Sequence, residues 1–410
     1  MKGAGNDKSD NPCVQALLAG NDILLAPYAP ISDYKAVKEA IESGVIPMKL
    51  VEDKCKKILQ YKYVAGLNHY KPISLPGLSD RLNTAHAAWL AAELNAEAIT
   101  LLKNEDDVLP LKKLNQTKIA VLSIGSGVTS DFEETVSKYA KADFFTITRS
   151  SSASKIQQIY RKLNKYDLII CAVHTVRIPE SQALQTLARQ KKLVYAFFTI
   201  PYFCKSYKKS IESAKAVVMG YEGTPLAQQY AAQVIFGGIG AKGKLPVSIP
   251  DLYYAGTGIF TEKVRLGYHE PEAVGLDAER LAEITSIAEE GLKAKAYPGC
   301  QLLVAKDGWV VYNRAFGSYE YNRKQPVTTE SVYDLASASK ASGTLLAVMK
   351  AYDEKKFKLT DKISAYIPEL KDSNKSNITI RELLFHQSGL VPSINFYTKA
   401  MEKGSDDQAF

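Results

Sequence analysis

Leu168-Ile-Ile-Cys-Ala-Val173 is a run of six apolar residues that ends at a histidine and a threonine. An unbroken apolar run of this length is typical of a strand buried on both faces, as in a parallel sheet between helices. Similar runs recur along the chain, at residues 99–104, 119–124, 144–148, 194–200 and 216–219. Amphipathic helical patterns separate these runs. Residues 79–252 are therefore predicted to form a three-layer α/β sandwich with a mainly parallel sheet.

The preceding residues divide into a linker and a helical region. Residues 71–78 are rich in proline, glycine and serine and predict a linker, after which an alanine-rich pattern predicts one long helix over residues 79–98. Within residues 1–70 we predict one buried strand, at residues 22–27, and three helices, at residues 11–20, 33–43 and 48–61. One strand cannot close a core. We therefore expect residues 1–70 to be the end of a larger α/β domain, with an exposed apolar sheet edge.

The residues that follow the sandwich predict a second linker, over residues 253–273, and a third domain over residues 274–410. The third domain begins with a helix at residues 277–296 that has apolar residues along one face. Two apolar runs then flank Lys306-Asp-Gly308, which is a strong signal for a β-hairpin.

A serine and a lysine lie three residues apart in Tyr333-Asp-Leu-Ala-Ser-Ala-Ser-Lys340, at the start of a predicted helix. This spacing puts the two side chains on one helical face. A partly desolvated lysine amine can accept the proton of a serine hydroxyl, which activates that hydroxyl for attack on a carbonyl carbon. Ser337 and Lys340 are therefore the candidate nucleophile and base. The alternative is a helix-capping serine beside a solvated lysine.

The Ser-x-x-Lys spacing also occurs at three other places, which start at Ser32, Ser152 and Ser206. The copy at Ser152 has the same four residues, Ser-Ala-Ser-Lys, but lies in a polar cluster before an amphipathic helix and predicts an N-cap. Only the copy at Ser337 has apolar residues on both sides, which predicts a buried helix that opens on the nucleophile.

The composition argues against several classes of partner. The 410-residue chain has a net charge of +8, spread without a basic stripe interleaved with aromatic residues, so we expect no nucleic-acid partner. No apolar run approaches the ~18 residues of a membrane span, so no transmembrane segment is expected. The five cysteines and five histidines are scattered and lack the spacing of a disulfide framework or a metal site. We therefore expect no metal.

Two features near the predicted strand ends could suggest small-molecule sites. Gly125-Ser-Gly127 follows a strand, but Ser130 stands where a dinucleotide-binding loop has its third glycine, so no nucleotide cofactor is expected. His174 and Glu222 each follow a buried run, where α/β folds often build sites. We interpret both as hydrogen-bonded residues at a domain interface.

Six stretches in residues 1–273 follow one another in a recognisable order, the last of them in the second linker. They are Met1-Lys-Gly-Ala4, Ala16-Leu-Leu-Ala-Gly-Asn-Asp-Ile-Leu-Leu25, Ala98-Ile-Thr-Leu-Leu-Lys-Asn104, Tyr221-Glu-Gly-Thr-Pro-Leu226, Gly243-Lys-Leu-Pro-Val247 and Arg265-Leu-Gly-Tyr268. This set resembles glycoside hydrolase family 3. The resemblance implies that residues 1–70 are the end of a TIM-type barrel and that residues 79–252 are the family's second domain.

The same resemblance implies a glycosidase of the β-N-acetylhexosaminidase type. It places the family's aspartate nucleophile immediately before Met1 and its general acid further upstream. Asp7, Asp10 and Asp22 do not match the nucleophile position and receive no role; we interpret them as capping or solvated loop residues.

A second ordered set lies in residues 274–410. It comprises Pro298-Gly299, Asp307-Gly308, Phe316-Gly317, Leu359-Thr-Asp361, Tyr366-Ile-Pro368 and Ile378-Thr-Ile-Arg-Glu-Leu-Leu-Phe-His-Gln-Ser-Gly-Leu390. With the Ser-x-x-Lys motif, this set resembles the serine β-lactamases and penicillin-binding-protein-like hydrolases, especially their class C and esterase branch. The resemblance implies the first part of an α+β fold, with Ser337 as nucleophile, Lys340 as its base and a structural role for His386.

Two further motifs of that family, a Tyr-x-Asn and a late Lys-Thr-Gly or His-x-Gly strand, do not occur after Ser337, and Tyr397 receives no role. The resemblances together imply a fragment of a bifunctional hydrolase that acts on a carbohydrate or peptidoglycan-like substrate, in the periplasm or outside the cell. As alternatives, the third domain is an esterase for sugar esters or a degenerate binding module. We expect the 410-residue chain itself to hydrolyse no glycoside and to react at most slowly at Ser337.

Overall fold

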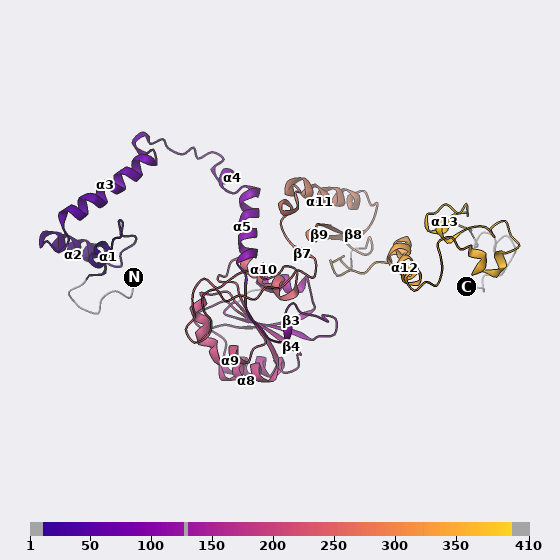
Figure 1. The fold of residues 1–410 in the computed structure, drawn as a ribbon, viewed down its shortest axis with the longest axis horizontal. Coiled ribbons are helices and arrows are strands. Elements are labelled where there is room, and N and C mark those ends of the chain that lie inside the picture. Colours follow the sequence, from indigo (N-terminus) through magenta and orange to yellow (C-terminus); the bar gives the residue numbers. More distant parts are fainter. Residues whose placement is uncertain (1–10, 127–129, 323, 396–410) are drawn as a thin grey trace. The chain divides into compact units, whose positions relative to one another are not determined.

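The computed structural model describes residues 11–126, 130–322 and 324–395. The chain divides into two compact units, residues 1–278 and residues 279–410, and each unit is described by itself (Figure 1). Among the described residues, no helix is both long enough and apolar enough to cross a membrane.

The first unit contains a six-stranded sheet in the order β1-β6-β5-β4-β2-β3. Strands β2 to β6 are parallel, and β1 pairs antiparallel to β6 at one edge. The strands are β1 (Thr100–Asn104), β2 (Ile119–Ile124), β3 (Ala142–Ile147), β4 (Leu168–Val173), β5 (Lys192–Phe197) and β6 (Ala216–Met219). The predicted α/β class with a mainly parallel sheet is confirmed, and β2, β4 and β6 have the bounds of the predicted runs.

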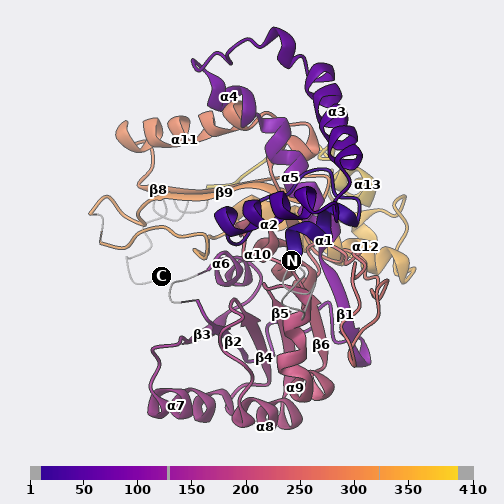
Figure 2. The ribbon, with the colours of Figure 1, turned by 90° about the vertical axis from the view of Figure 1, so that its left-hand side faces the viewer.

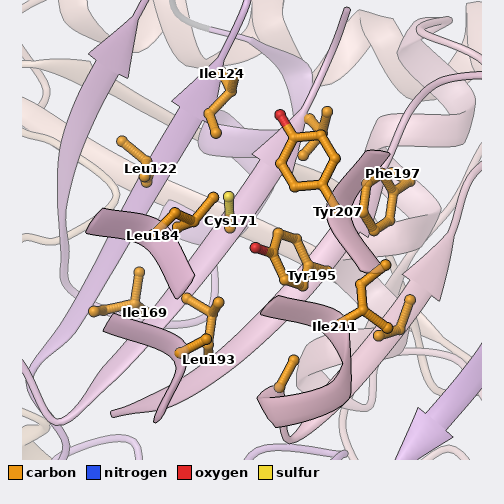
Figure 3. Close-up of a cluster of buried hydrophobic side chains, with 14 of the residues drawn as sticks. Leu122, Ile124, Ile169, Cys171, Leu184, Leu193, Tyr195, Phe197, Tyr207 and Ile211 are labelled. Carbon is orange, nitrogen blue, oxygen red and sulfur yellow. The ribbon is translucent and has the colours of Figure 1, made fainter. Parts of the chain in front are cut away.

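Helices lie on both faces of this sheet (Figure 2). On one face, α7 (Ala153–Leu163), α8 (Gln182–Gln190) and α9 (Lys208–Ser213) contribute apolar side chains to the main buried cluster. That cluster includes Leu122, Cys171, Leu184 and Ile211 (Figure 3). On the other face, α10 (Pro225–Phe236) packs against α5 (Ala85–Ala98) and α6 (Asp131–Ser137). The result is the expected arrangement of three layers.

Buried tyrosine hydroxyl groups in the main cluster have hydrogen-bond partners. Tyr195 donates to Ser210 Oγ over 2.7 Å, and Ser210 Oγ donates to the carbonyl oxygen of Tyr207 over 3.1 Å. Tyr207 donates to the carbonyl oxygen of Ile178 over 2.7 Å. Burial of a large apolar side chain contributes about 1.5–3 kcal/mol. An unpaired buried hydroxyl would cancel much of that gain, since it costs about 1–3 kcal/mol.

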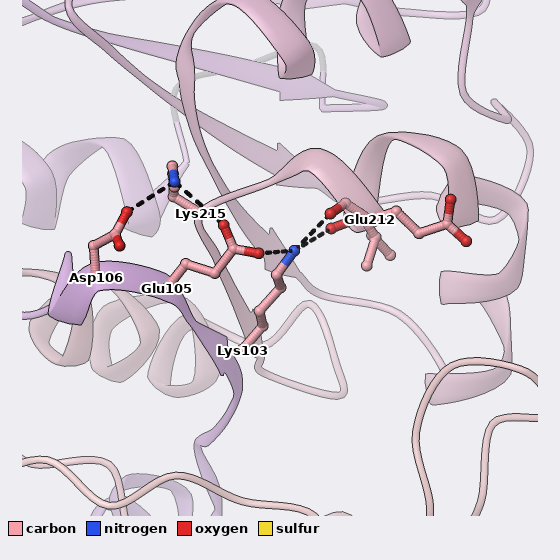
Figure 4. Close-up of polar contacts among 6 residues, drawn as sticks. Lys103, Glu105, Asp106, Glu212 and Lys215 are labelled. Carbon is pink, nitrogen blue, oxygen red and sulfur yellow. Dashed lines mark hydrogen bonds and ion pairs between the residues drawn. The ribbon is translucent and has the colours of Figure 1, made fainter.

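Ion pairs and hydrogen bonds surround the antiparallel edge of the sheet, and one lysine there also reaches α9 (Figure 4). Lys103 Nζ lies 2.9 Å from Glu105, and Lys215 Nζ lies 3.3 Å from Glu105 and 2.8 Å from Asp106. Lys103 also donates to the carbonyl oxygen of Glu212 over 2.8 Å, near the carboxyl end of α9. A cation at this helix end satisfies carbonyl groups that have no partner within the helix. The hydrogen bond from Lys103 is the main cause that lowers the pKa of Glu105.

The first part of the unit contains α1 (Pro12–Leu18), α2 (Pro30–Glu42) and α3 (Met48–Val64) around a small apolar cluster. The three predicted helices are confirmed, but the strand predicted at residues 22–27 was wrong. These residues form no strand, and the side chains of Ile23 and Leu25 are 67% and 87% exposed. A strand requires a partner in a ladder, and no described residue pairs with this segment, so its apolar pattern alone does not produce one.

The single helix predicted over residues 79–98 was also wrong. The structure has two helices, α4 (Leu78–Leu82) and α5, separated at Asn83 and Thr84. Thr84 Oγ1 accepts a hydrogen bond from the backbone N–H of Ala87 over 3.1 Å and so caps α5. Asparagine and threonine side chains compete with the helix for backbone hydrogen bonds. These two residues therefore favour a break in the helix at their position.

The second unit begins at the second residue of α11 (Ala278–Lys293), which is followed by the hairpin of β8 (Gly299–Lys306) and β9 (Trp309–Gly317). Asp307 and Gly308 both have positive φ, at 51° and 82°, as a type I′ turn requires, so the predicted hairpin is confirmed. The hydroxyl groups of Thr285 and Tyr312 lie 3.0 Å apart and join the helix to the hairpin. The remaining elements are β7 (Gly267–Tyr268) in the first unit, and α12 (Leu345–Asp353) and α13 (Ile380–Leu384) in the second.

The buried helix predicted around Ser337 was wrong. Residues 332–347 are all exposed, and α12 has no buried residue. Leu346 and Met349, which were expected to face a core, are more than half exposed. Apolar residues at helical spacing show which face of a helix could be buried, but burial also requires a surface that packs against that face.

Candidate active site

Ser337 lies in a tight helical turn before α12. Ala336–Ala338 form one 3₁₀ turn, and Lys340–Thr344 continue as a π-helical turn that leads into α12. In this turn Lys340 Nζ donates to Ser337 Oγ over 3.0 Å. The structure therefore brings these two side chains together, as their spacing on one face predicted.

The contact between Ser337 and Lys340 suits general-base activation. A base must lie about 2.6–3.2 Å from the hydroxyl oxygen whose proton it accepts, and the observed distance falls in this range. An uncharged amine in the same place would accept the hydroxyl proton instead of donating its own. Both side chains are exposed, so a substrate bound over them would have to supply the desolvation that a lysine base requires.

The turn has a second feature that sequence reasoning missed. Asp334 Oδ1 accepts a hydrogen bond from the backbone N–H of Ala336 over 2.8 Å. Ala336 has a φ of 44°, in the left-handed region that residues with a Cβ seldom occupy. An aspartate that binds the backbone two residues further on forms an Asx turn. The sequence signal is an aspartate three residues before the serine, but that spacing does not reveal the φ of Ala336.

The identical copy at Ser152 has a different geometry. Ser152 is the N-cap of α7, and its Oγ accepts a hydrogen bond from the backbone N–H of Lys155 over 3.3 Å. It also lies 3.0 Å from the hydroxyl of Ser154. The predicted N-cap is confirmed, and this hydroxyl is engaged by the backbone of its own helix.

His174 and Glu222 lie at the ends of strands, as expected, but their surroundings differ. The ring of His174 stacks on Phe198 with 4.9 Å between ring centroids, and its Nε2 is buried without a hydrogen-bond partner in the described part of the chain. The backbone N–H of His174 donates to the carbonyl oxygen of Ile124 over 2.8 Å, so the interpretation of His174 as a hydrogen-bonded residue holds for its backbone but not for its ring Nε2. Burial lowers the pKa of His174 to about 4, so this ring is neutral at pH 7. Glu222 is exposed and accepts a hydrogen bond from Thr224 over 3.1 Å.

The other candidates from the sequence form ion pairs or backbone hydrogen bonds, or lie outside the described residues. Asp22 forms ion pairs with Lys54 and Lys57, and the hydrogen bond from Lys57 is the main cause that lowers its pKa. His386 lies just after α13, with a φ of 55°, and its N–H donates to the carbonyl oxygen of Leu383. Three residues considered in the sequence lie outside the described part of the chain: Asp7, Asp10 and Tyr397.

Thiols and metal ligands do not form a rival site in the described residues. There, no group of three or more histidine, cysteine, aspartate or glutamate side chains is placed to hold a metal ion. The five cysteines are free, and Cys13, Cys171 and Cys204 are buried. Burial raises the pKa of Cys204 to about 12, which keeps this thiol protonated and poorly nucleophilic at neutral pH.

Residues 284–407 match the protein-family model described as Beta-lactamase, so this part of the chain is β-lactamase-like. The N-acetylmuramyl-L-alanine amidase of Bacillus subtilis (strain 168) is 31% identical over 140 residues, which cover 31% of this chain and 32% of that protein. A putative D-alanyl-D-alanine carboxypeptidase of Escherichia coli (strain K12) is 33% identical over 144 residues, which cover 32% of this chain and 33% of that protein. The chain thus spans about a third of the length of these curated relatives.

Solved structures similar to the chain include glycosidases. A glycoside hydrolase family 3 β-N-acetylglucosaminidase from Paenibacillus sp. str. FPU-7 aligns with a TM-score of 0.44 and 20% identity, over 58% of this chain and 47% of that one. A β-glucosidase from Listeria innocua aligns with a TM-score of 0.42 and 18% identity, over 60% of this chain and 38% of that one. These similarities concern the arrangement of helices and strands in part of each chain.

Proposed function

We propose that the second unit supplies the nucleophile and the base of a serine hydrolase of the β-lactamase and carboxypeptidase type. The observation that carries this proposal is the 3.0 Å contact between Lys340 Nζ and Ser337 Oγ, in a segment that matches the β-lactamase family model. The identical tetrapeptide at Ser152 lies outside that segment and lacks this contact among the described interactions.

The proposed reaction proceeds through an acyl-enzyme. Lys340, as the neutral amine, accepts the proton of the Ser337 hydroxyl while Oγ forms a bond to the carbonyl carbon of an amide or ester. The tetrahedral intermediate then breaks its bond to the leaving nitrogen or oxygen, and the leaving group takes up the proton that Lys340 had accepted, which returns the amine to its neutral form. Water, deprotonated by the same amine, releases the acyl group and restores the hydroxyl. The lysine thus acts first as a base and then as an acid.

The proposed substrate class is the peptide part of peptidoglycan. The two relatives named above carry the names of an amidase of N-acetylmuramyl-L-alanine and a carboxypeptidase of D-alanyl-D-alanine, and both names refer to bonds of the cell wall. An amide substrate would place its carbonyl carbon at Ser337. A sugar ester would react at the same hydroxyl, so one experiment that compares amide and ester reagents also tests the esterase alternative.

We also propose that the first unit derives from a glycosidase, so that the complete activity is bifunctional. Three of its family-3-like stretches meet in the structure. The hydroxyl groups of Thr100 and Tyr221 lie 2.6 Å apart. Gly243 packs so closely on residues 98–100 that a Cβ at this position would lie 2.3 Å from the carbonyl oxygen of Ala98. Motifs that lie far apart in the sequence are therefore in contact within one folded unit.

We further propose that the chain consists of three domains, residues 1–70, 79–252 and 274–410, joined by linkers at residues 71–78 and 253–273. All six strands of the large sheet lie within residues 79–252, which supports the middle domain. The division of the chain into units at residues 278 and 279 supports a boundary close to the second linker.

Covalent labelling tests the proposed serine chemistry. The 410-residue chain is incubated with an excess of a fluorophosphonate, of a penicillin and of a short activated ester, and adducts are followed by intact mass and peptide mapping. We expect one slow adduct, on Ser337, that Ser337→Ala abolishes and Ser152→Ala leaves unchanged. The ratio of penicillin to ester reactivity separates an amide-directed site from an esterase. An adduct that persists in Ser337→Ala, or no adduct under any condition, would overturn the proposal.

A further inference from the structure

We infer that Asp334 is a positioning residue for Ser337, an inference that rests on the proposed serine hydrolase function. The carboxylate touches neither the nucleophile nor the base in the observed contacts. It holds the backbone one residue before the nucleophile, through the 2.8 Å hydrogen bond from the N–H of Ala336.

The backbone of Ala336 needs such support. Its φ of 44° brings Cβ close to the following carbonyl group, and for this reason residues other than glycine seldom adopt it. Strained residues of this kind persist where the surrounding structure holds them, and they cluster at functional sites. The residue at this strained position directly precedes Ser337, so its conformation sets the direction in which the chain presents the hydroxyl.

Local hydrogen bonds hold this turn on both sides of the nucleophile. The N–H of Ala338 donates to the carbonyl oxygen of Leu335 over 2.9 Å, and Ser342 Oγ donates to the carbonyl oxygen of Ala338 over 2.9 Å. Residues 332–347 are exposed, so packing contributes little to keeping the turn in place. The hydrogen bond from Ala336 to Asp334 therefore carries a large share of the alignment between Ser337 and Lys340.

The copy at Ser152 lacks this device. Arg149 stands three residues before its serine, and none of the described residues with positive φ lies between residues 149 and 155. Ser152 itself has the extended backbone of an N-cap, with φ of −68° and ψ of 153°. The two copies thus differ in the three residues before the serine, although the tetrapeptides are the same.

Rescue experiments separate positioning from a general contribution to folding. The rate of Ser337 acylation by a fluorophosphonate is measured as a maximal rate and a half-saturating concentration in the 410-residue chain and its variants. We expect Asp334→Ala to lower the maximal rate about tenfold, with the half-saturating concentration unchanged, since misplacing a reacting group by about 1 Å can cost up to about 100-fold in rate. Asp334→Asn keeps an oxygen acceptor and should stay within about threefold of the unmodified chain.

The double variant Asp334→Ala with Ala336→Gly gives the sharpest test. Glycine adopts positive φ without strain, so it should restore most of the rate that Asp334→Ala removes. Asp372→Ala, at an exposed aspartate of the same unit, is the matched control and should change nothing. Equal acylation rates for the unmodified chain and Asp334→Ala would overturn the positioning role alone. A chain without any Ser337 adduct would overturn the proposed function and, with it, this role.

Discussion

The same four residues, Ser-Ala-Ser-Lys, occur in both units of this protein with opposite consequences. In the first unit the hydroxyl of Ser152 accepts a hydrogen bond from the backbone N–H of Lys155, and the serine is the N-cap of α7. In the second unit the hydroxyl of Ser337 accepts a hydrogen bond from the side-chain amine of Lys340. The difference lies in the backbone of the serine, which is extended at Ser152 and lies within a helical turn at Ser337.

An extended N-cap serine turns its hydroxyl toward the backbone of its own helix, whereas a serine inside a turn directs it toward residues on the same face. The short Ser-x-x-Lys motif therefore specifies the residue types but not the contact between them. We infer that the residues before the motif influence the contact, and at Ser337 they include Asp334 and the left-handed Ala336.

The largest expected effect separates the two lysines. Lys340→Ala should lower the rate of Ser337 acylation to below about a hundredth of its value, because general-base catalysis contributes about 10²–10⁴-fold. Lys155→Ala should leave that rate unchanged. The measurement is adduct formation with a fluorophosphonate, followed by intact mass. Similar rates in the two variants would remove the functional distinction between the copies.

The next largest effect is a dependence of the stability of the first unit on pH, which is caused by the buried His174. The folded state lowers the pKa of His174 from 6.5 to about 4, so the unfolded state binds this proton more readily. The corresponding stability is fully present above pH 6.5 and is lost progressively as the pH falls toward 4, by on the order of 3 kcal/mol. Urea unfolding at pH 7 and pH 4.5, followed by circular dichroism, measures this loss.

His174→Phe should keep the stacking on Phe198 and reduce the loss of stability between these two pH values. His386→Ala, at the exposed histidine of the second unit, is the control and should keep the full loss. An identical pH dependence for His174→Phe and the unmodified chain would show that other groups cause the acid sensitivity.

The smallest effect distinguishes the two serines by stability. Ser152→Ala should lower the free energy of unfolding of the first unit by about 1 kcal/mol, since it removes an N-cap hydrogen bond. Ser337→Ala should change stability by less than about 0.5 kcal/mol, as expected for an exposed residue that caps no helix. Urea unfolding at pH 7 measures both values. A larger loss in Ser337→Ala than in Ser152→Ala would reverse the structural roles that we assign.

The sequence predicted the sheet well because most of its strands are apolar runs bounded by polar residues. Strands β2, β4 and β6 match the predicted runs. The run at residues 194–200 was placed too far along the chain, since β5 begins at Lys192 and ends at Phe197. Prediction failed where an apolar segment has no other element packed against it. Residues 22–27 have the composition of a buried strand, and α12 has the pattern of a buried helix, yet both segments are largely exposed.

The candidate site was predictable only in part. The contact between Ser337 and Lys340 follows from helical spacing, so the sequence suffices for it. The hydrogen bond to Asp334 depends on the positive φ of Ala336, and alanine gives no sign of that conformation. The break between α4 and α5 escaped prediction for a related reason, since the alanine-rich pattern hides the cap at Thr84.

The antiparallel strand at the edge of the sheet also has a consequence for the order in which the protein assembles. Thr100 in β1 pairs with Met219 in β6, and these positions are 119 residues apart in the chain (219 − 100). During synthesis β1 is made first, and it stays without its partner β6 until the intervening strands β2 to β5 have been made. In that interval an apolar strand without a partner can pair with another chain. Lys103, which lies in β1, and Glu105, which directly follows it, later form an ion pair at this edge. Before β6 is made, they place charges on and beside the unpaired strand and so oppose that association.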